Sequence, residues 1–274
     1  MKTAVLKLSL IACSAMLVMV SCKKEIRQTE SNQLSQNKKE EIRKTLAKGL
    51  MAYYPFAGNT LDSSGNGNNV IFNNCTATAG RYGNPDGAYL FDGSSNYMQV
   101  KNSPSLNPSK ITVMAVVKIN GFYQGLCHGN RIIQKGNSDA VNGEFFMGFD
   151  DARYTNGANC DGNAPDEDHQ NVYGIYGNTP GLATQAGDFS NYLVAGKWYT
   201  FVFTYDGSTA KFYVDGELRD TRLFTAISTK NNQDVFFGRL NSSQYPYWFN
   251  GAIDEIRMYN YALTDEQVAV LSGK

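Results

Sequence analysis

The sequence lacks an excess of charge of either sign. Lys and Arg together number 25, Asp and Glu together also number 25, and the formal net charge at pH 7 is +0. The basic residues are scattered along the chain apart from the pairs at 23–24 and 38–39, whereas a surface that binds nucleic acid needs Lys and Arg gathered on one face. We therefore expect no nucleic-acid partner.

The chain is also poor in the residues of nucleophilic catalysis and of zinc sites. Its two histidines are His128 and His169, and neither is accompanied by a serine or cysteine elbow that would carry a nucleophile. The CxxC and HxxxH spacings typical of zinc ligands do not occur. These absences argue against a hydrolase built on a nucleophile and a base, and against a zinc protein.

Long hydrophobic runs are missing too, and the most apolar stretch lies at the N-terminus. Residues 8–20 are thirteen in number, apolar except for two serines, and follow Lys2 and Lys7. This is the length of a signal-peptide core and falls short of the roughly 20 residues that span a membrane. The run ends in Met19-Val20-Ser21-Cys22, which resembles the lipobox of bacterial lipoproteins, although that motif usually has leucine in place of the methionine. We expect residues 1–21 to be a signal peptide and Cys22 to be lipidated; ordinary secretion that leaves Cys22 a plain thiol is the alternative.

The segment that follows has few large apolar residues. Residues 22–49 are rich in Lys, Glu, Gln, Asn and Ser, so they cannot bury enough apolar surface to offset the entropy lost on ordering. We interpret them as the lipid anchor and a polar tether at the bacterial cell envelope, at the outer membrane or the cell surface. Residues 39–48 contain good helix formers with Ile42 and Leu46 on one side, which predicts a short helix ended by Gly49.

Residues 50–274 have the composition of one all-β domain. The chain carries 17 Tyr, 15 Phe and 26 Gly, which suits short strands joined by tight turns. Alternating runs at 198–205 and 210–214 are each followed by an Asp-Gly pair, the strongest short signal of a hairpin turn. Further strands are predicted at Ala52–Phe56, Ala88–Phe91, Tyr97–Val100, Ile111–Ile119, Gly143–Phe149, Val235–Arg239 and Ala252–Tyr259.

These strands recur without helices between them, which predicts a two-sheet antiparallel jelly-roll sandwich. A short C-terminal helix is expected where Thr264 and Gln267 fit the capping-box spacing. The segment from Gly121 to Tyr173 is longer and more polar than a hairpin needs. We interpret it as a loop elaboration.

Several segments jointly resemble one family. In chain order they are Ala52–Phe56, Leu61–Asn68, Ala88–Gly93, Gly196–Tyr199, Tyr205–Gly207, Tyr213–Gly216 and Phe249–Thr264. Together they resemble the laminin-G-like branch of the concanavalin A-like lectin/glucanase superfamily, across residues 50–274. The resemblance implies the jelly-roll fold. Because the superfamily holds both glycan hydrolases and binding modules, it leaves the function open.

The sequence lacks the carboxylate pattern that catalysis in this superfamily implies. Its glucanases carry a motif resembling Glu-x-Asp-x-Glu, whose period of two puts three carboxylates on one sheet face, and retaining glycosidases need two about 5 to 5.5 Å apart. The nearest candidates are the neighbours Asp254-Glu255 and Asp150-Asp151, which point to opposite faces of a regular strand. We therefore predict that the protein is not an enzyme, with glycan hydrolysis as an alternative.

Binding of a glycan, or of an envelope or host glycoprotein, is the function we predict. Aromatic rings stack on the C–H faces of sugars while polar side chains bond the hydroxyls, and two segments between strands supply both kinds of group. The candidate ligand-binding residues are Tyr245, Tyr247, Trp248, His169 and Tyr173. Two alternatives stay open: Tyr247 and Trp248 plug the end of the sandwich, or the module is a protein adhesion module.

Two cysteines inside the expected loop elaboration are a candidate disulfide. Cys127 and Cys160 can bond in an oxidising compartment outside the cytoplasm, where a closed loop of this length restrains the unfolded chain by about 3 to 4 kcal/mol. Cys75 is then left as an odd thiol. We expect it to be a small buried hydrophobe.

A structural calcium ion is the one cofactor that we consider. Members of the superfamily that this chain resembles often carry calcium, and their first and last strands lie side by side and antiparallel. Such pairing would bring the loop that holds Asp62, Asn66 and Asn68 next to Asp254, and calcium takes six to eight oxygen ligands of these kinds. The alternative is that Asp62 and Asp254 only cap their own turns.

Overall fold

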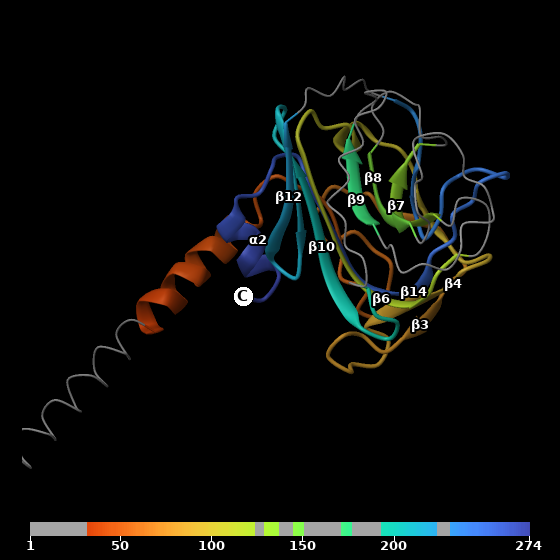
Figure 1. Ribbon diagram of the computed structural model, residues 1–274, viewed down its shortest axis with the longest axis horizontal. Helices are drawn as coiled ribbons and strands as arrows, with labels where there is room; N and C mark the ends of the chain where they lie inside the picture. Colours follow the sequence, from red (N-terminus) through yellow and green to blue (C-terminus); the bar gives the residue numbers. More distant parts are fainter. Residues whose placement is uncertain (1–31, 124–128, 137–144, 151–170, 177–192, 224–230) are drawn as a thin grey trace, which may run out of the picture. The chain divides into compact units, whose positions relative to one another are not determined.

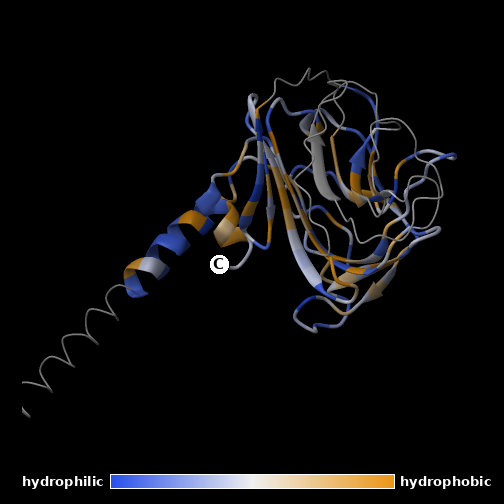
Figure 2. Cartoon of the chain, viewed as in Figure 1, coloured by the Kyte–Doolittle hydropathy of each residue, from blue (hydrophilic) through white to orange (hydrophobic). Residues whose placement is uncertain are grey.

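A computed structural model describes residues 32–123, 129–136, 145–150, 171–176, 193–223 and 231–274. For Asp150 and residues 171–176 it describes the backbone alone. The chain divides into two compact units, Met1–Leu46 and Ala47–Lys274. In the first unit, residues 32–45 are helical, and the helix is almost wholly hydrophilic (Figure 2). Exposed pairs such as Lys44–Glu41, 2.9 Å apart, support it. The expected helix is therefore confirmed, but it begins earlier than its apolar residues indicated.

The second unit is built from two antiparallel sheets (Figure 1). One is eight-stranded, with the order β12-β11-β10-β6-β14-β4-β3 and β1 paired with β14; the other is six-stranded, with the order β2-β5-β13-β7-β8-β9. The strands of the eight-stranded sheet are β1 (Leu50–Tyr54), β3 (Thr76–Thr78), β4 (Ala88–Asp92), β6 (Ile111–Gly121), β10 (Trp198–Tyr205), β11 (Thr209–Val214), β12 (Glu217–Leu223) and β14 (Asn250–Tyr259). Those of the six-stranded sheet are β2 (Val70–Asn73), β5 (Met98–Val100), β7 (Gly129–Lys135), β8 (Phe145–Asp150), β9 (Asn171–Tyr176) and β13 (Val235–Phe237).

The core lies between the two sheets, because alternate residues of facing strands point inward. One large cluster of buried residues joins them and includes Phe91, Phe149, Phe201, Phe237 and Phe249. Each fully buried phenylalanine contributes roughly 1.5 to 3 kcal/mol of transfer free energy. The predicted jelly-roll sandwich is confirmed.

The C-terminal segment covers part of the eight-stranded sheet. The hydroxyl of Thr112, on β6, donates to the carbonyl of Tyr261 at 2.8 Å and accepts from Leu263 N. A short helix, α2 (Asp265–Leu271), follows, and its capping box joins Thr264 and Gln267 reciprocally, as predicted. A second helical turn, η1 (Pro104–Leu106), joins β5 to β6.

The expected loop elaboration between Gly121 and Tyr173 is partly wrong, because β7 lies inside it. All seven residues of β7 are buried, so no alternation marks the strand. Its outer face carries polar residues, including Arg131 and Gln134, which made the segment read as a loop. β7 nevertheless pairs with β13 and β8 in the middle of the six-stranded sheet.

Candidate ligand-binding site

The outward face of the six-stranded sheet carries a row of aromatic and amide side chains. Cross-strand pairing aligns five of its strands, and in β5, β13 and β8 the residues on either side of the paired residue belong to the core. The row runs through Phe72, Gln99, Phe236, Gln134 and Phe146. Phe72 lies at the open end, where 41% of it is exposed, whereas Phe146 is buried.

At that open end, three half-exposed side chains form what we call the aromatic–arginine cluster: Tyr97, Arg239 and Trp248. The guanidinium carbon of Arg239 lies 4.6 Å from the ring centroid of Trp248 and 5.0 Å from that of Tyr97. The two rings are 6.3 Å apart, and Phe72 stacks on Tyr97 at 4.6 Å. The cluster therefore joins the edge of the sheet to the loop between β13 and β14.

Gly238 positions Arg239. It has a φ of +85°, and a Cβ there would come within 2.2 Å of the Phe91 ring, so only glycine fits without displacement. Gly238 N donates to Ile132 O and its carbonyl accepts from Phe249 N, both at 3.0 Å. The backbone is thus fixed on both sides immediately before Arg239.

Arg239 is held by backbone carbonyls and by rings. Its Nε donates to Leu240 O at 2.9 Å and its Nη2 donates to Ser242 O at 3.2 Å. Across the part of the chain that the structure describes, no carboxylate forms an ion pair with it. Burial lowers the pKa of Arg239, since desolvation disfavours the charged form.

The loop between β13 and β14 separates the three aromatic candidates that it carries. Tyr247 is buried, with Arg131 over its ring at 4.7 Å, and it adopts a left-handed φ of 47°. It therefore packs against Arg131 and Leu240. Trp248 is half exposed and joins the aromatic–arginine cluster, and Tyr245 is also half exposed, its hydroxyl accepting from Gln244.

Two further predicted ligand-binding residues are not brought to the cluster by any described contact. His169 lies outside the described residues. Tyr173 lies in β9, where its backbone is in register with Gly148, and its side chain is not described. Sequence reasoning missed Tyr97 and Arg239, although both fell within predicted strands. Their meeting depends on β5 pairing with β13, which no local pattern encodes.

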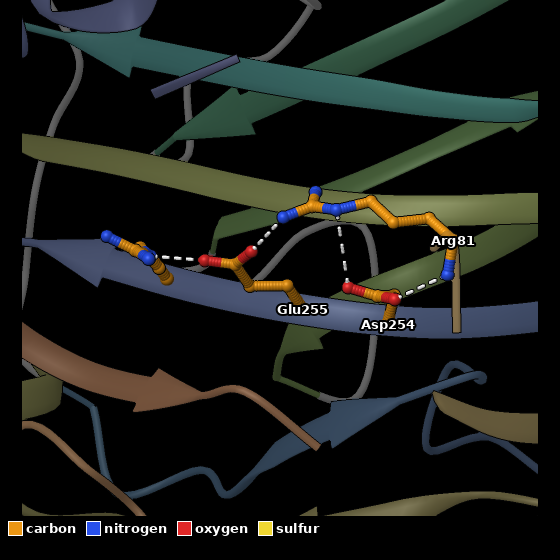
Figure 3. Close-up of polar contacts among 4 residues, drawn as sticks. Arg81, Asp254 and Glu255 are labelled. Atoms are coloured by element: carbon orange, nitrogen blue, oxygen red, sulfur yellow. Dashed lines mark hydrogen bonds and ion pairs between the residues drawn. The ribbon is translucent and has the colours of Figure 1, made fainter. Parts of the chain in front are cut away.

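A second group of charged residues joins β14 to Arg81, which lies between β3 and β4, and is drawn in Figure 3. Arg81 Nη2 donates to Glu255 at 2.7 Å, Arg81 N donates to Asp254 at 2.7 Å, and Arg81 Nε lies 3.6 Å from the other Asp254 oxygen. Glu255 also accepts from Arg257, whose guanidinium covers the ring of Tyr53 at 4.2 Å. Burial raises the pKa of Asp254.

The prediction that Asp254 and Glu255 point to opposite faces is wrong. The register of β14 against β6 shifts between Ile253 and Glu255, so Asp254 is the extra residue of a β-bulge. A bulge re-aims side chains, and both carboxylates reach Arg81 from one side of the strand. They are 7% and 5% exposed and each is already bound to arginine.

Of the four predicted calcium ligands, Asp62, Asn66 and Asn68 lie in one loop, and no described contact joins them to Asp254. The carboxylate of Asp62 accepts from Tyr53 N, Ser64 N, Asn68 N and the hydroxyl of Ser64, at 2.8 to 2.9 Å. Asp254 instead belongs to the Arg81 group. Within the described ranges, no three His, Cys, Asp or Glu side chains gather in a group that could hold a metal ion. The Asp62 contacts fit turn capping.

The same loop binds the free edge of β1. The side-chain amide of Asn66 donates to Leu50 O at 2.8 Å, and that of Asn68 donates to Met51 O at 2.9 Å. β1 pairs with β14 as expected, but in a register that sets Leu50 opposite Tyr259. The loop runs along β1, and the described structure shows no contact between it and residues 250–254, where the calcium prediction had placed it.

Of the cysteines singled out in the sequence, the structure describes Cys75. Cys22, Cys127 and Cys160 lie outside the described residues. Cys75 is a free, half-buried thiol that packs against the core, and burial raises its pKa. Among the residues that the structure describes, no helix has the length and apolar character needed to cross a membrane.

A surface hollow of about 510 Å³ lies beside α2, away from the cluster. Its lining includes Thr204, Lys211 and Asp265. Lys211 and Tyr213 both donate to the carboxylate of Asp265, at 2.7 Å. These two bonds hold the C-terminal segment against the sheet.

Fold and family agree. Two stacked antiparallel sheets with a short C-terminal helix define a protein of the jelly-roll sandwich class. The family model described as "Concanavalin A-like lectin/glucanases superfamily" matches residues 92–269, more than half of the chain. The protein belongs to this family. No curated protein sequence matches it.

Solved structures share the fold at low sequence identity. Domain 4 of the extracellular arabinanase AbnA from Geobacillus stearothermophilus, in complex with arabinotriose, aligns at a TM-score of 0.59 and 19% identity, covering 82% of this chain and 98% of that one. A Trypanosoma rangeli sialidase in complex with sialic acid aligns at 0.54 and 14%, covering 82% and 32%. Botulinum neurotoxin type C, whose cell entry depends on two ganglioside molecules, aligns at 0.52 and 13%, covering 84% and 52%.

Proposed function

We propose that this protein is a non-catalytic carbohydrate-binding module, exported and held at the bacterial cell envelope by a lipid on Cys22. The observation that carries the proposal is the aromatic–arginine cluster. Tyr97 and Trp248 are half exposed at the open end of a sheet face whose other end is buried. Aromatic surface with a few fixed polar groups is the usual composition of a small-ligand site, and such rings can stack on sugars.

The similar structures support a glycan as the ligand. Two of them are complexes, with arabinotriose and with sialic acid, and cell entry of the third depends on gangliosides. These ligands differ from one another, so the likeness supports the class of ligand and not its identity. The ligand here is set by the side chains at the end of the sheet.

The position of the acidic pair on β14 supports the absence of catalysis. A glycosidase needs one carboxylate free to donate a proton and another free to attack or activate water. Asp254 and Glu255 are buried, and both are ion-paired with Arg81. In this arrangement neither Asp254 nor Glu255 is free to donate a proton or to act as a nucleophile.

Glycan binding by the full chain in detergent, measured on an array, tests the proposal. Trp248→Ala should reduce binding at least tenfold, since it removes one ring face of the cluster. Tyr82→Ala is the matched control, because Tyr82 is 83% exposed in the loop between β3 and β4 and should leave binding unchanged. A chain that binds no glycan but captures host glycoprotein through its polypeptide would support protein adhesion instead.

A further inference from the structure

We infer that the aromatic–arginine cluster binds a sugar residue that carries an anionic group, a carboxylate or a sulfate, and that Arg239 pairs with this group. The inference rests on the proposed glycan-binding function and names the class of sugar. It comes from the partners of Arg239 and from the way its guanidinium is held.

Arg239 differs in its partners from five other arginines of the described structure. Each of the five pairs with a carboxylate: Arg43, Arg81, Arg219, Arg222 and Arg257. Arg239 contacts two rings and two carbonyls instead. A partly buried cation gives up hydration, and a facing anion is the partner that best offsets this loss.

The acidic residues nearest to the cluster in sequence are engaged elsewhere. Asp92, which precedes Tyr97, accepts from the backbone N–H groups of residues 94, 95 and 96, at 2.8 to 2.9 Å. The Ser95 hydroxyl also donates to Asp92, and this bond together with the backbone bonds holds the pKa of Asp92 well below its usual range. Asp234, before β13, accepts from the Gln99 side chain at 2.6 Å and from Asn102 N at 2.8 Å. Neither carboxylate pairs with Arg239.

The guanidinium is also fixed before any ligand arrives. Ring faces of Tyr97 and Trp248 flank it, and the carbonyls of Leu240 and Ser242 take two of its five N–H groups. The remaining N–H groups can bond a carboxylate or sulfate in the fork geometry that arginine favours. The neighbouring indole of Trp248 then meets the sugar ring that bears the anion.

An array that pairs each acidic oligosaccharide with its neutralised form tests the inference on the full chain in detergent. The acidic probes are uronic-acid, sialic-acid and sulfated oligosaccharides, and their partners are carboxyl-reduced or desulfated. We expect acidic probes to bind at least tenfold more tightly than their partners, and binding to weaken as salt is raised. Comparing the carboxylated and sulfated probes shows which anion is preferred.

Variants of Arg239 complete the test. Arg239→Gln should abolish the preference for acidic probes, and Arg239→Lys should keep part of it because the charge remains. Arg222→Gln is the control, since Arg222 lies on β12 of the other sheet. Equal binding of acidic and neutralised probes by the unmodified chain would overturn the inference and leave the proposed function standing. Binding to no glycan at all would overturn both, and the unmodified chain decides even if a variant fails to fold.

Discussion

Glu255 neutralises two arginines at once, because one carboxylate oxygen accepts from Arg81 and the other from Arg257. Asp254 shares Arg81 with it but pairs with no second arginine in the described structure. The two neighbours on β14 thus have different roles. Glu255 compensates buried charge, while Asp254 fixes the backbone of the loop that carries Arg81.

This difference predicts unequal effects on stability. Glu255→Gln should lower the free energy of unfolding by about 3 to 5 kcal/mol, since it leaves two poorly hydrated guanidinium groups without their shared counter-ion. Asp254→Asn keeps an acceptor for Arg81 N and should lower it by about 1 kcal/mol. Urea unfolding of both variants measures the difference. Equal losses would contradict the roles assigned here.

Asp254 should also make the free energy of unfolding depend on pH. The raised pKa of Asp254 means that the folded chain takes up this proton more readily than the unfolded chain does. The contribution of Asp254 to stability is therefore fully present below the unfolded pKa of about 3.9 and is lost as pH rises through the folded value. Asp254→Asn removes this component, which unfolding at several acidic pH values would detect.

At the scale of elements, the loop between β1 and β2 takes the place of a neighbouring strand. β1 pairs with β14 on one side only, and on the other side its carbonyls at Leu50 and Met51 accept from the amides of Asn66 and Asn68. Unpaired strand edges invite association with other chains. The loop closes this edge, and Asp62 holds the loop in shape.

Asp62→Ala should therefore destabilise the chain whether or not calcium is present. It removes an acceptor of four hydrogen bonds. We expect the free energy of unfolding to fall by about 2 to 4 kcal/mol. Each bond to a charged acceptor contributes about 1.5 to 3 kcal/mol, but the four bonds together offset the cost of desolvating one carboxylate, so their contributions do not add. Melting temperatures in chelator and in millimolar calcium give the measurement. A calcium effect that Asp62→Ala abolishes would place an ion in this loop and contradict pure turn capping.

The elements that sequence predicted best are those whose two faces differ or whose turns need particular residues. The hairpin of β10 and β11 carries an Asp-Gly turn, and α2 begins with its capping box at Thr264. β7 escaped because it is buried on both faces and polar on one. The bulge at Asp254 escaped because a register shift leaves no local mark in the sequence.

The candidate site was predicted only through Trp248. Its partners Tyr97 and Arg239 lie just before β5 and just after β13, more than a hundred residues apart in sequence, and become neighbours because those two strands pair. Whether an arginine has a carboxylate partner likewise depends on the folded chain. No pattern around Arg239 distinguishes it from Arg257, although Arg257 pairs with a carboxylate and Arg239 lies between two rings.

At the scale of the whole molecule, we propose that a polar segment connects the ligand-binding sandwich to a membrane. Cys22→Ala should abolish labelling by a palmitate analogue and move the protein from the membrane to the soluble fraction, because a lipid on Cys22 is the only membrane attachment we propose. Serine substitution at Cys75 is the control and should leave both unchanged. Membrane partition that persists without Cys22 would contradict the anchor.

A glycan bound at the aromatic–arginine cluster would lie against Trp248, whose fluorescence then reports binding. The chain has two tryptophans; Trp198→Phe leaves Trp248 as the sole reporter, since Trp198 lies at the start of β10 in the other sheet. Titration of this variant with a glycan that binds the full chain should change the intensity or wavelength of Trp248 emission, with a midpoint equal to the calorimetric Kd. Calorimetric binding that leaves Trp248 emission unaltered would place the ligand elsewhere and contradict the account.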